Sequence, residues 1–305
     1  MRSLFPSLLL ALAVLGGCQA SGTADAVPGG ETLGRVVEQA QALVRPSRRS
    51  HGITVPIPPA REGLELPPVT GSQDPSRPLI VIDPGHGGHD PGAVSGQGGD
   101  LEKDVTLALA RALRDALAGN GRLRVAMTRD DDRYLALQER YDVARRMGAD
   151  LFISLHADAA DNDGAQGASI YTLSETASDR EAARLAAREN RADIVNGINV
   201  GGQTGTVASI LIDLSQRDAM VRSVEFADLL HREAGRSIPF RQPYRRFASL
   251  VVLKAPDIPS VLFEAGYLTS AQDAARLASP QGRRAVAEGV ASAVQLYFAR
   301  RAVAS

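Results

Sequence analysis

Short apolar runs alternate with stretches of helical spacing through most of the chain. Residues 79–82, 151–155 and 260–263 are rich in Ile, Val, Leu and Phe, which is typical of strands buried on both faces of a parallel sheet. Residues 101–118 and 134–147 instead carry apolar residues at the three- and four-residue spacing of a helix. This alternation predicts an α/β fold with an open, mainly parallel sheet and helices on both of its faces.

Other segments extend the same pattern. Strands are expected at residues 123–128, 168–173 and 250–253, a mainly helical section at 178–234 with a Gly-rich break at 196–206, and a last helix at 281–300. We therefore expect one catalytic domain at residues 78–302, with a helical insertion at about 174–235. No internal repeat is visible.

The amino-terminal region has the composition of a leader and a tether. Residues 8–14 form an apolar run too short to span a bilayer, which predicts a secretory signal peptide at residues 1–17. Cys18, the only cysteine, follows small residues directly. This pattern resembles the bacterial lipoprotein signal, which implies lipidation of Cys18 and, with Gln19 next, an outer-membrane anchor facing the periplasm. The alternative is an ordinary signal peptide with an incidental cysteine.

Residues 18–77 are rich in Pro, Gly, Ser and charge, and they predict a tether with a short helix near residues 31–44. The chain of 305 residues is 44% hydrophobic, which is enough material for one large domain. Its net charge of −1 gives no electrostatic case for nucleic acid or an anionic membrane surface. No coiled-coil seam or dimer stripe is visible, so we expect a monomer.

Three side chains that can bind metal or transfer protons follow apolar runs. His86 lies in a Gly-rich turn after the first run, His156 ends the second, and Glu264 ends the third. Ligands bind beyond the carboxyl ends of the strands in open sheets of this kind. These three side chains are therefore expected at one sheet edge, as in a metal-dependent hydrolase.

Glu102 begins the helix that follows the His86 turn, so its side chain is expected at the same edge. Alone, it would be interpreted as a carboxylate that stabilises the helix dipole. Together with His86 and His156 it completes the two-His, one-Glu ligand set of a catalytic zinc site. We therefore expect one Zn²⁺ ion on these residues, with Glu264 transferring protons. Structural histidines and a salt-bridged Glu264 are the alternatives.

Other polar residues near these runs give weaker predictions. His89 is expected to be a solvated loop residue, whereas Asp90 could orient His86 and Asp158 could support His156 or cap its loop. Arg129 and the acidic residues 130–132 are interpreted as a turn. His51 and His231 are expected to be structural or incidental.

Several separate motifs, in order, resemble the zinc-dependent N-acetylmuramoyl-L-alanine amidases of bacterial cell walls. They are IDPGHGGHDPGA (residues 82–93), LEKDVTL (101–107), Thr128-Arg129, FISLHAD (152–158) and PSVLFEAGYLTS (259–270). The resemblance implies zinc ligands at His86, Glu102 and His156 and a catalytic glutamate at Glu264. It also implies the reaction, which is hydrolysis of the amide between the muramoyl lactyl group and L-alanine in peptidoglycan. Tyr267 and Ser270 depart mildly from the Phe and Asn of many relatives.

The helical insertion resembles that of the division-associated periplasmic amidases. In that subgroup a helix blocks the zinc with a carboxylate until an activator of the LytM type displaces it. The resemblance makes Glu189 the candidate blocking ligand, and residues 209–214 (SILIDL) a candidate surface for the partner. The alternative is that Glu189 is one more solvated charge on a charged helix. No wall-binding domain precedes the catalytic part, so Cys18 is expected to provide localisation.

Two other functions remain open at this point. A zinc peptidase that cuts within the stem peptide would use the same ligands and the same proton donor. A wall-binding lipoprotein without catalytic activity would keep the zinc but not need Glu264. The leading hypothesis is a periplasmic, lipid-anchored zinc amidase that splits the septal wall and is restrained by its own insertion.

Overall fold

The computed structural model describes residues 65–304, apart from 97–98, 120, 161–163 and 195–205, and the side chains at 193–194, 206–214 and 304 also lie outside this description. The expected signal peptide, Cys18, His51 and the tether up to residue 64 therefore fall outside the described residues, as do the side chains of residues 209–214. None of the described helices is both long and apolar enough to cross a membrane.

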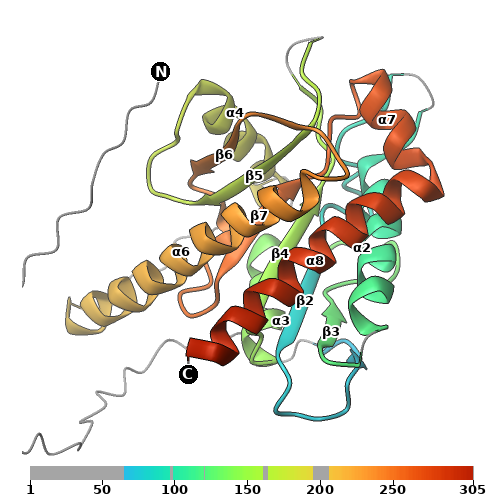
Figure 1. Cartoon of the computed structure of the whole chain (residues 1–305). Coiled ribbons are helices and arrows are strands. Elements are labelled where there is room, and N and C mark those ends of the chain that lie inside the picture. The colour runs from blue at the N-terminus through green and yellow to red at the C-terminus, as the bar shows by residue number, and fades with distance from the viewer. Residues whose placement is uncertain (1–64, 97–98, 120, 161–163, 195–205, 305) are drawn as a thin grey trace, which may run out of the picture. The chain divides into compact units, whose positions relative to one another are not determined.

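Strands and helices alternate along the described chain (Figure 1). In order they are β1 (Thr70–Gly71), β2 (Leu79–Pro84), α2 (Glu102–Ala118), β3 (Arg124–Met127), α3 (Leu137–Arg146), β4 (Leu151–His156), β5 (Ala168–Leu173), α4 (Arg180–Glu189), α5 (Arg191–Ile194), α6 (Thr206–Ala234), β6 (Phe240–Ala248), the 3-10 helix η1 (Val251–Leu253), β7 (Ser260–Glu264), α7 (Ala271–Ala278) and α8 (Pro280–Ala304).

The strands form one seven-stranded sheet in the order β1-β3-β2-β4-β7-β5-β6. The pairs β2–β3, β2–β4, β4–β7 and β5–β6 are parallel, whereas β1–β3 and β5–β7 are antiparallel. Every residue of β2, β4 and β7 is buried, which explains their nearly continuous apolar sequences. The predicted open, mainly parallel sheet is confirmed.

Helices cover both faces of this sheet, as expected (Figure 1). One face packs against α2, α6 and α8, where Leu109 and Phe226 join Ile153 of β4 in a single core. The other face packs against α3, α4 and η1, where Leu185 joins Phe152 of β4. Since side chains alternate along a strand, His156 of β4 lies on the same face as Phe152, beneath α4.

Two segments differ from the sequence expectations. The strand expected at residues 250–253 is wrong, because this apolar segment forms η1 and closes the core over α3. The polar strand β6 was not predicted. It is an edge strand that pairs with β5 on one side only, so it tolerates the charged residues and proline that argue against an interior strand.

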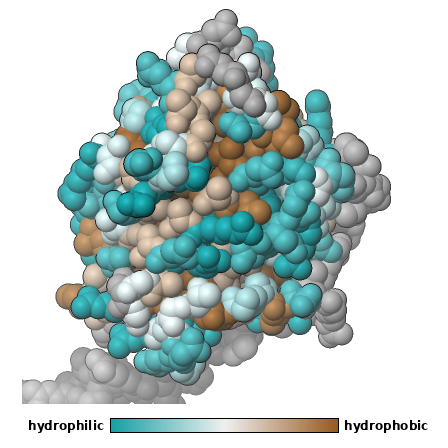
Figure 2. All heavy atoms as spheres, turned by 90° about the vertical axis from the view of Figure 1, so that its right-hand side faces the viewer, coloured by the Kyte–Doolittle hydropathy of each residue, from teal (hydrophilic) through white to brown (hydrophobic). Residues whose placement is uncertain are grey.

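The surface on the side where α2 and α7 lie is mixed in character. Figure 2 shows that hydrophilic residues are interspersed there with several separate hydrophobic patches. Such a mixture is normal for a folded protein surface.

Candidate active site

The loop that carries His86 has an uncommon backbone conformation and close neighbours. His86 has a φ of 60°, in the left-handed region that residues with a Cβ seldom adopt. A Cβ on Gly85 would lie 2.5 Å from Cε1 of His156, and one on Gly92 would lie 2.7 Å from Cδ2 of His86. The glycines of this motif therefore let the backbone pack directly against both imidazole rings.

Two buried arginines donate hydrogen bonds to the backbone of this loop. Arg129 donates a hydrogen bond of 2.7 Å to the carbonyl oxygen of Gly85, and Arg140 donates one of 2.9 Å to that of His86. Arg140 also forms a 3.0 Å ion pair with the buried carboxylate of Asp83. Burial and the neighbouring charge of Arg140 lower the pKa of Arg129 to about 10, so it stays charged at neutral pH. These contacts support the uncommon conformation of His86.

The interpretation of Arg129 as a turn residue therefore missed its role, because Arg129 is fully buried. The acidic residues that follow it are exposed, as expected of a turn. One of them, Asp132, accepts a 2.8 Å hydrogen bond from the backbone N–H of Gly88 and pairs with Lys103 at 2.7 Å. The His86 loop is thus held at two further points.

Glu102 is the first residue of α2 and is fully buried. Its Oε2 lies 3.1 Å from Nε2 of His86, and its Oε1 lies 3.2 Å from Nδ1 of His156. The backbone N–H groups of Ala93 and Ala157 donate to the same two oxygens at 2.8 and 2.9 Å. Burial alone would raise the pKa of Glu102, but the two histidines hold it well below its usual range. Glu102 is therefore far more than a helix-terminal charge.

His86 is oriented by a neighbouring carboxylate, and nearby carboxylates raise the pKa values of both histidines. Nδ1 of His86 lies 2.9 Å from Oδ2 of Asp90, so this ring nitrogen can carry the proton and leave Nε2 free for another partner. Burial would lower the pKa of His86, but the charges of Glu102 and Glu189 raise it well above its usual value. Burial also opposes protonation of His156, whose pKa Glu189 and Glu102 nevertheless raise.

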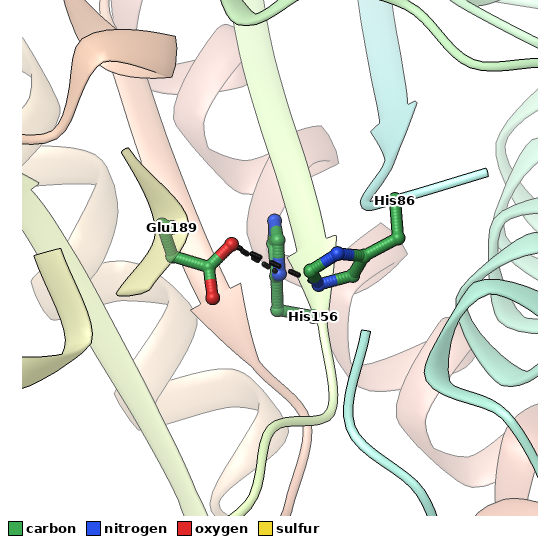
Figure 3. A group of neighbouring side chains, drawn as sticks. All are labelled: His86, His156 and Glu189. Carbon is green, nitrogen blue, oxygen red and sulfur yellow. Dashed lines mark ion pairs between the residues drawn. The ribbon is translucent and has the colours of Figure 1, made fainter. Parts of the chain in front are cut away.

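The carboxylate of Glu189 reaches the two histidines from the carboxyl end of α4 (Figure 3). Its Oε2 lies 3.7 Å from Nε2 of His86 and 3.4 Å from Nδ1 of His156. One donor atom from each of these three residues lies within 4.8 Å of the others, and all three residues are buried. Glu102 directs a separate oxygen at each histidine, whereas Glu189 presents a single oxygen to both.

The donor atoms of His86, His156 and Glu189 are spaced closely enough to hold one metal ion. Ligand atoms about 2.1 Å from zinc lie about 3.4 Å from one another, and Oε2 of Glu189 lies 3.7 and 3.4 Å from the two histidine nitrogens. Glu102 reaches the same histidines with two different oxygens, at 3.1 and 3.2 Å. Nε2 of His86 is buried and has no hydrogen-bond partner among the described residues. Imidazole and carboxylate donors without cysteine also suit zinc. His86, His156 and Glu189 could therefore hold such an ion, with Glu102 in contact with both histidines.

Glu264 ends β7 beside this group, in register with His156 on the neighbouring strand β4. Its Oε2 accepts a 3.1 Å hydrogen bond from the backbone N–H of Asp158, whereas its buried Oε1 has no partner in the part of the chain that the structure describes. Burial raises the pKa of Glu264 to about 8. The charge of His156 opposes this increase, and the nearby carboxylates of Glu102 and Glu189 add to it. Glu264 can therefore both accept and release a proton near neutral pH.

The remaining polar residues lie mostly as the weaker predictions had them. Asp90 contacts His86, as described above. The side chain of Asp158 accepts a hydrogen bond from the backbone N–H of Ala159 and forms an ion pair with Arg188 of α4, which fits the suggested loop cap and not the suggested support of His156. His89 is exposed and lies against the ring of Tyr134, with the ring centroids 4.4 Å apart. His231 stacks on the ring of Tyr244 at 3.6 Å, which agrees with a structural role.

Helix α4 and the short α5 that follows it lie against the donor group. The side chain of Asn190 bridges the backbone of Ser249 and Val251 at 2.8 and 3.0 Å. The hydroxyl of Tyr134 donates a 3.0 Å hydrogen bond to the carbonyl of Ala192. A cleft of about 280 Å³ remains beside the donors, between the His86 loop and these two helices.

The residues that support the site were largely missed from the sequence. Arg140 is one of several charged residues on an amphipathic helix, and Arg188 is one of several arginines on α4. No local pattern separates them from their solvent-facing neighbours. For Arg129 a signal did exist, since it belongs to a motif of the resemblance.

Comparisons with known proteins agree with this arrangement. The family model described as N-acetylmuramoyl-L-alanine amidase matches residues 80–296. The chain is 34% identical over 245 residues to N-acetylmuramoyl-L-alanine amidase AmiC of Escherichia coli O6:H1, covering 80% of this chain and 57% of that protein. It is 36% identical to N-acetylmuramoyl-L-alanine amidase AmiA of Salmonella typhimurium, covering 73% of this chain and 77% of that protein.

A solved structure gives the same result. The catalytic domain of CwlV, an N-acetylmuramoyl-L-alanine amidase from Bacillus (Paenibacillus) polymyxa var. colistinus, superposes with a TM-score of 0.55 at 25% identity. The match covers 73% of this chain and 98% of that domain. The chain therefore belongs to the N-acetylmuramoyl-L-alanine amidase family.

Proposed function

We propose that this protein hydrolyses the amide bond between the lactyl group of N-acetylmuramic acid and L-alanine in peptidoglycan, using one zinc ion. The observation that carries the proposal is the convergence of His86 and His156 on the buried Glu102, at 3.1 and 3.2 Å, beside the protonatable Glu264. The names of the related amidases supply the bond that is cut. The geometry of the donor atoms supports a metal-assisted mechanism for cutting it.

The residues divide the work as follows. The chemistry that zinc supplies in such a site is Lewis acidity, which polarises the amide carbonyl and lets water lose a proton near pH 7. Glu264 takes the proton of the attacking water and delivers it to the leaving nitrogen of L-alanine. Its buried setting, with one oxygen held by the N–H of Asp158, keeps the other oxygen available for that transfer. Asp90 fixes the ring of His86.

We further propose that α4 keeps the enzyme silent until it is displaced. Glu189 presents Oε2 to both histidines, at the distance expected of an additional metal ligand. A carboxylate at that position would take the place that water and substrate need. The ion pair of Arg188 with Asp158 would hold the same helix next to Glu264. Restraint of this kind suits an enzyme that weakens the cell wall.

The cellular setting is part of the same proposal. A partner protein of the LytM type would displace α4, and the enzyme would act as a monomer in the periplasm on septal peptidoglycan during daughter-cell separation. Lipidation of Cys18 would anchor it to the outer membrane. A Cys18→Ser form should then be released into the soluble periplasmic fraction; its recovery with membranes would contradict lipidation.

A digest of purified sacculi tests the central reaction. Chelation should abolish activity and added zinc should restore it, and the products should carry new L-alanine amino termini and free lactyl carboxylates. Cleavage within the stem peptide that leaves the lactyl amide intact would establish the zinc peptidase instead. Binding to sacculi without any cleavage, unchanged by Glu264→Ala, would favour the non-catalytic lipoprotein.

A further inference from the structure

Two arginines of the edge strand β6 lie beneath α4, on the same side as the donor group. Arg246 is 5% exposed, and its Nε is buried without a hydrogen-bond partner in the described part of the chain. Arg241 is mostly buried as well, with its guanidinium 5.2 Å from the centre of the Tyr267 ring and 3.0 Å from the Tyr267 hydroxyl. A buried guanidinium requires a counter-charge.

The counter-charges come from α4. Arg241 forms a two-point ion pair with Glu181, one contact of which measures 3.1 Å. Arg246 pairs with Asp179 at 2.9 Å and lies 3.5 Å from Glu181. Among the described residues, two carboxylates pair with these arginines. Asp179 is the N-cap of α4, and Glu181 lies in its first turn. Removal of α4 would therefore leave both arginines without a carboxylate partner among the described residues.

Arg241 lies on the same sheet as Glu264, the proposed proton-transfer group, two strands away from it. The strand order β4-β7-β5-β6 places His156, Glu264, Ser169 and Arg241 on successive strands, with Glu264 in register with both His156 and Ser169. The register between β5 and β6 shifts between Ala168 and Ile170, just after Phe240, so the place of Arg241 is given by its side-chain contacts. Tyr267, three residues after Glu264, contacts Arg241 directly and bridges the interval.

Displacement of α4 would convert this buried pair into a binding surface. Two guanidinium groups without counter-charges attract carboxylates, which they bind through paired hydrogen bonds. A peptide that leaves the scissile bond in extended conformation advances about 3.5 Å per residue. A carboxylate on the residue after L-alanine would then come within reach of Arg241.

We propose that Arg241 and Arg246 form a subsite for a free carboxylate of the stem peptide, and that α4 fills this subsite with Glu181 and Asp179 when it covers the donors. The helix would thus occupy the metal position with one carboxylate and the substrate position with two others. This inference rests on the proposed amidase function and adds a specificity determinant to it.

The test uses two soluble muramoyl-peptides that differ only in the α-carboxyl group of the residue after L-alanine, which is a carboxylate in one and a carboxamide in the other. A second pair differs in the same way at the peptide's carboxyl terminus and shows which carboxylate is bound. Each kcat/KM is measured with the zinc-loaded full chain carrying Glu189→Ala. Charge-assisted hydrogen bonds predict a preference of about tenfold or more for the carboxylate of one pair, expressed in KM.

Arg241→Gln in this background should reduce that preference to nearly one, and Arg241→Lys should keep part of it. The matched control is Glu181→Gln, which removes the same ion pair from the helix side and should keep or increase the preference, because it leaves Arg241 in place and removes its competing carboxylate. A variant that only loosens α4 should change kcat/KM equally for the carboxylate and the carboxamide peptide. The ratio of these two kcat/KM values therefore reports binding of the carboxylate. Arg246→Gln provides a second, independent variant.

An unchanged ratio in Arg241→Gln and Arg246→Gln, with hydrolysis intact, would overturn the carboxylate subsite and leave the amidase function standing. Equal loss of the preference in Glu181→Gln and Arg241→Gln would also overturn it. The loss would then result from breaking the Arg241–Glu181 ion pair and not from loss of substrate binding by Arg241. Failure of every variant to cleave either peptide in the presence of zinc would overturn the amidase function, and the subsite with it.

Discussion

The loop that carries His86 and the helix that carries Glu189 contact each other at the proposed metal site, but they are held in place in different ways. The loop is fixed by Arg129 and Arg140, which are almost fully buried and bind its backbone carbonyls. The helix α4 is attached at its two ends by ion pairs in which one member is partly exposed, such as Arg188 with 41% of its side chain accessible, and the other is largely buried.

This difference has an energetic consequence. Breaking a buried ion pair by removing one partner costs about 3–5 kcal/mol, whereas an exposed pair contributes about 0–1 kcal/mol. The His86 loop should therefore keep its shape, whereas the ion pairs of α4, each with one partly exposed member, should cost less to break than the buried Arg140–Asp83 pair. A rigid donor group under a detachable helix is the arrangement that the proposed restraint needs.

The largest effect is expected at the group that both regions enclose. Glu264→Gln should reduce hydrolysis of sacculi by about 10²–10⁴-fold, because an amide cannot transfer the proton. The thermal unfolding temperature should not fall, since the substitution removes a buried carboxylate that folding disfavours. Digestion by the zinc-loaded variant at near wild-type rate would show that Glu264 is not the proton-transfer group.

A substitution in the rigid region should be costly for stability. Arg140→Met leaves the buried carboxylate of Asp83 without its 3.0 Å partner and the carbonyl of His86 without its donor. We expect the free energy of unfolding, measured by urea denaturation, to fall by about 3–5 kcal/mol.

The control for this variant is Arg146→Met, on the exposed side of the same helix α3. It should change the free energy of unfolding by less than about 0.5 kcal/mol. Equal effects of the two substitutions would contradict the distinction between the buried support and the surface of α3.

Removal of the blocking carboxylate should change activity and leave stability nearly intact. Glu189→Ala is expected to raise basal hydrolysis by about 5- to 100-fold, the range typical of regulatory coupling, because water and substrate no longer compete with its Oε2. Glu175→Ala, an exposed carboxylate ahead of α4, is the control. A wild-type protein that is already fully active alone would argue against self-inhibition.

The smallest effect is expected from a single attachment of the helix. Arg188→Gln removes the ion pair with Asp158 but leaves Glu189 in place, so basal activity should rise by only about two- to fivefold, as suits a partly exposed pair. Arg180→Gln, exposed at the other end of α4, should have no measurable effect. A larger increase for Arg188→Gln than for Glu189→Ala would reverse the assigned importance of the two contacts.

Much of the fold and the proposed site could be predicted because their residues carry local signals. The central strands have continuous apolar sequences, and His86, His156 and Glu264 follow directly after them. Parallel topology then brings strand ends to one edge, whatever the details of packing. The structure places these residues and Glu102 together, and their roles as ligands and proton donor stay predictions.

Strand β6 and the supporting arginines carried no such signal. An edge strand is permitted a polar sequence because only one side pairs, so FRQPYRRFA did not indicate a strand. Arg140 and Arg188 have the spacing of ordinary helix-surface residues. Their burial or pairing depends on which strand lies beneath the helix, and that is a property of the assembled layers.

By itself, the sequence determined which residues can bind a metal, where the buried strands run, and which edge of the sheet collects the polar strand ends. These follow from residue chemistry and from periodicity along the chain. Only the tertiary structure decided that one oxygen of Glu189 reaches both histidines and that Arg241 and Arg246 take their counter-charges from α4. Such contacts join residues distant in sequence, and their energies depend on burial that no local pattern specifies.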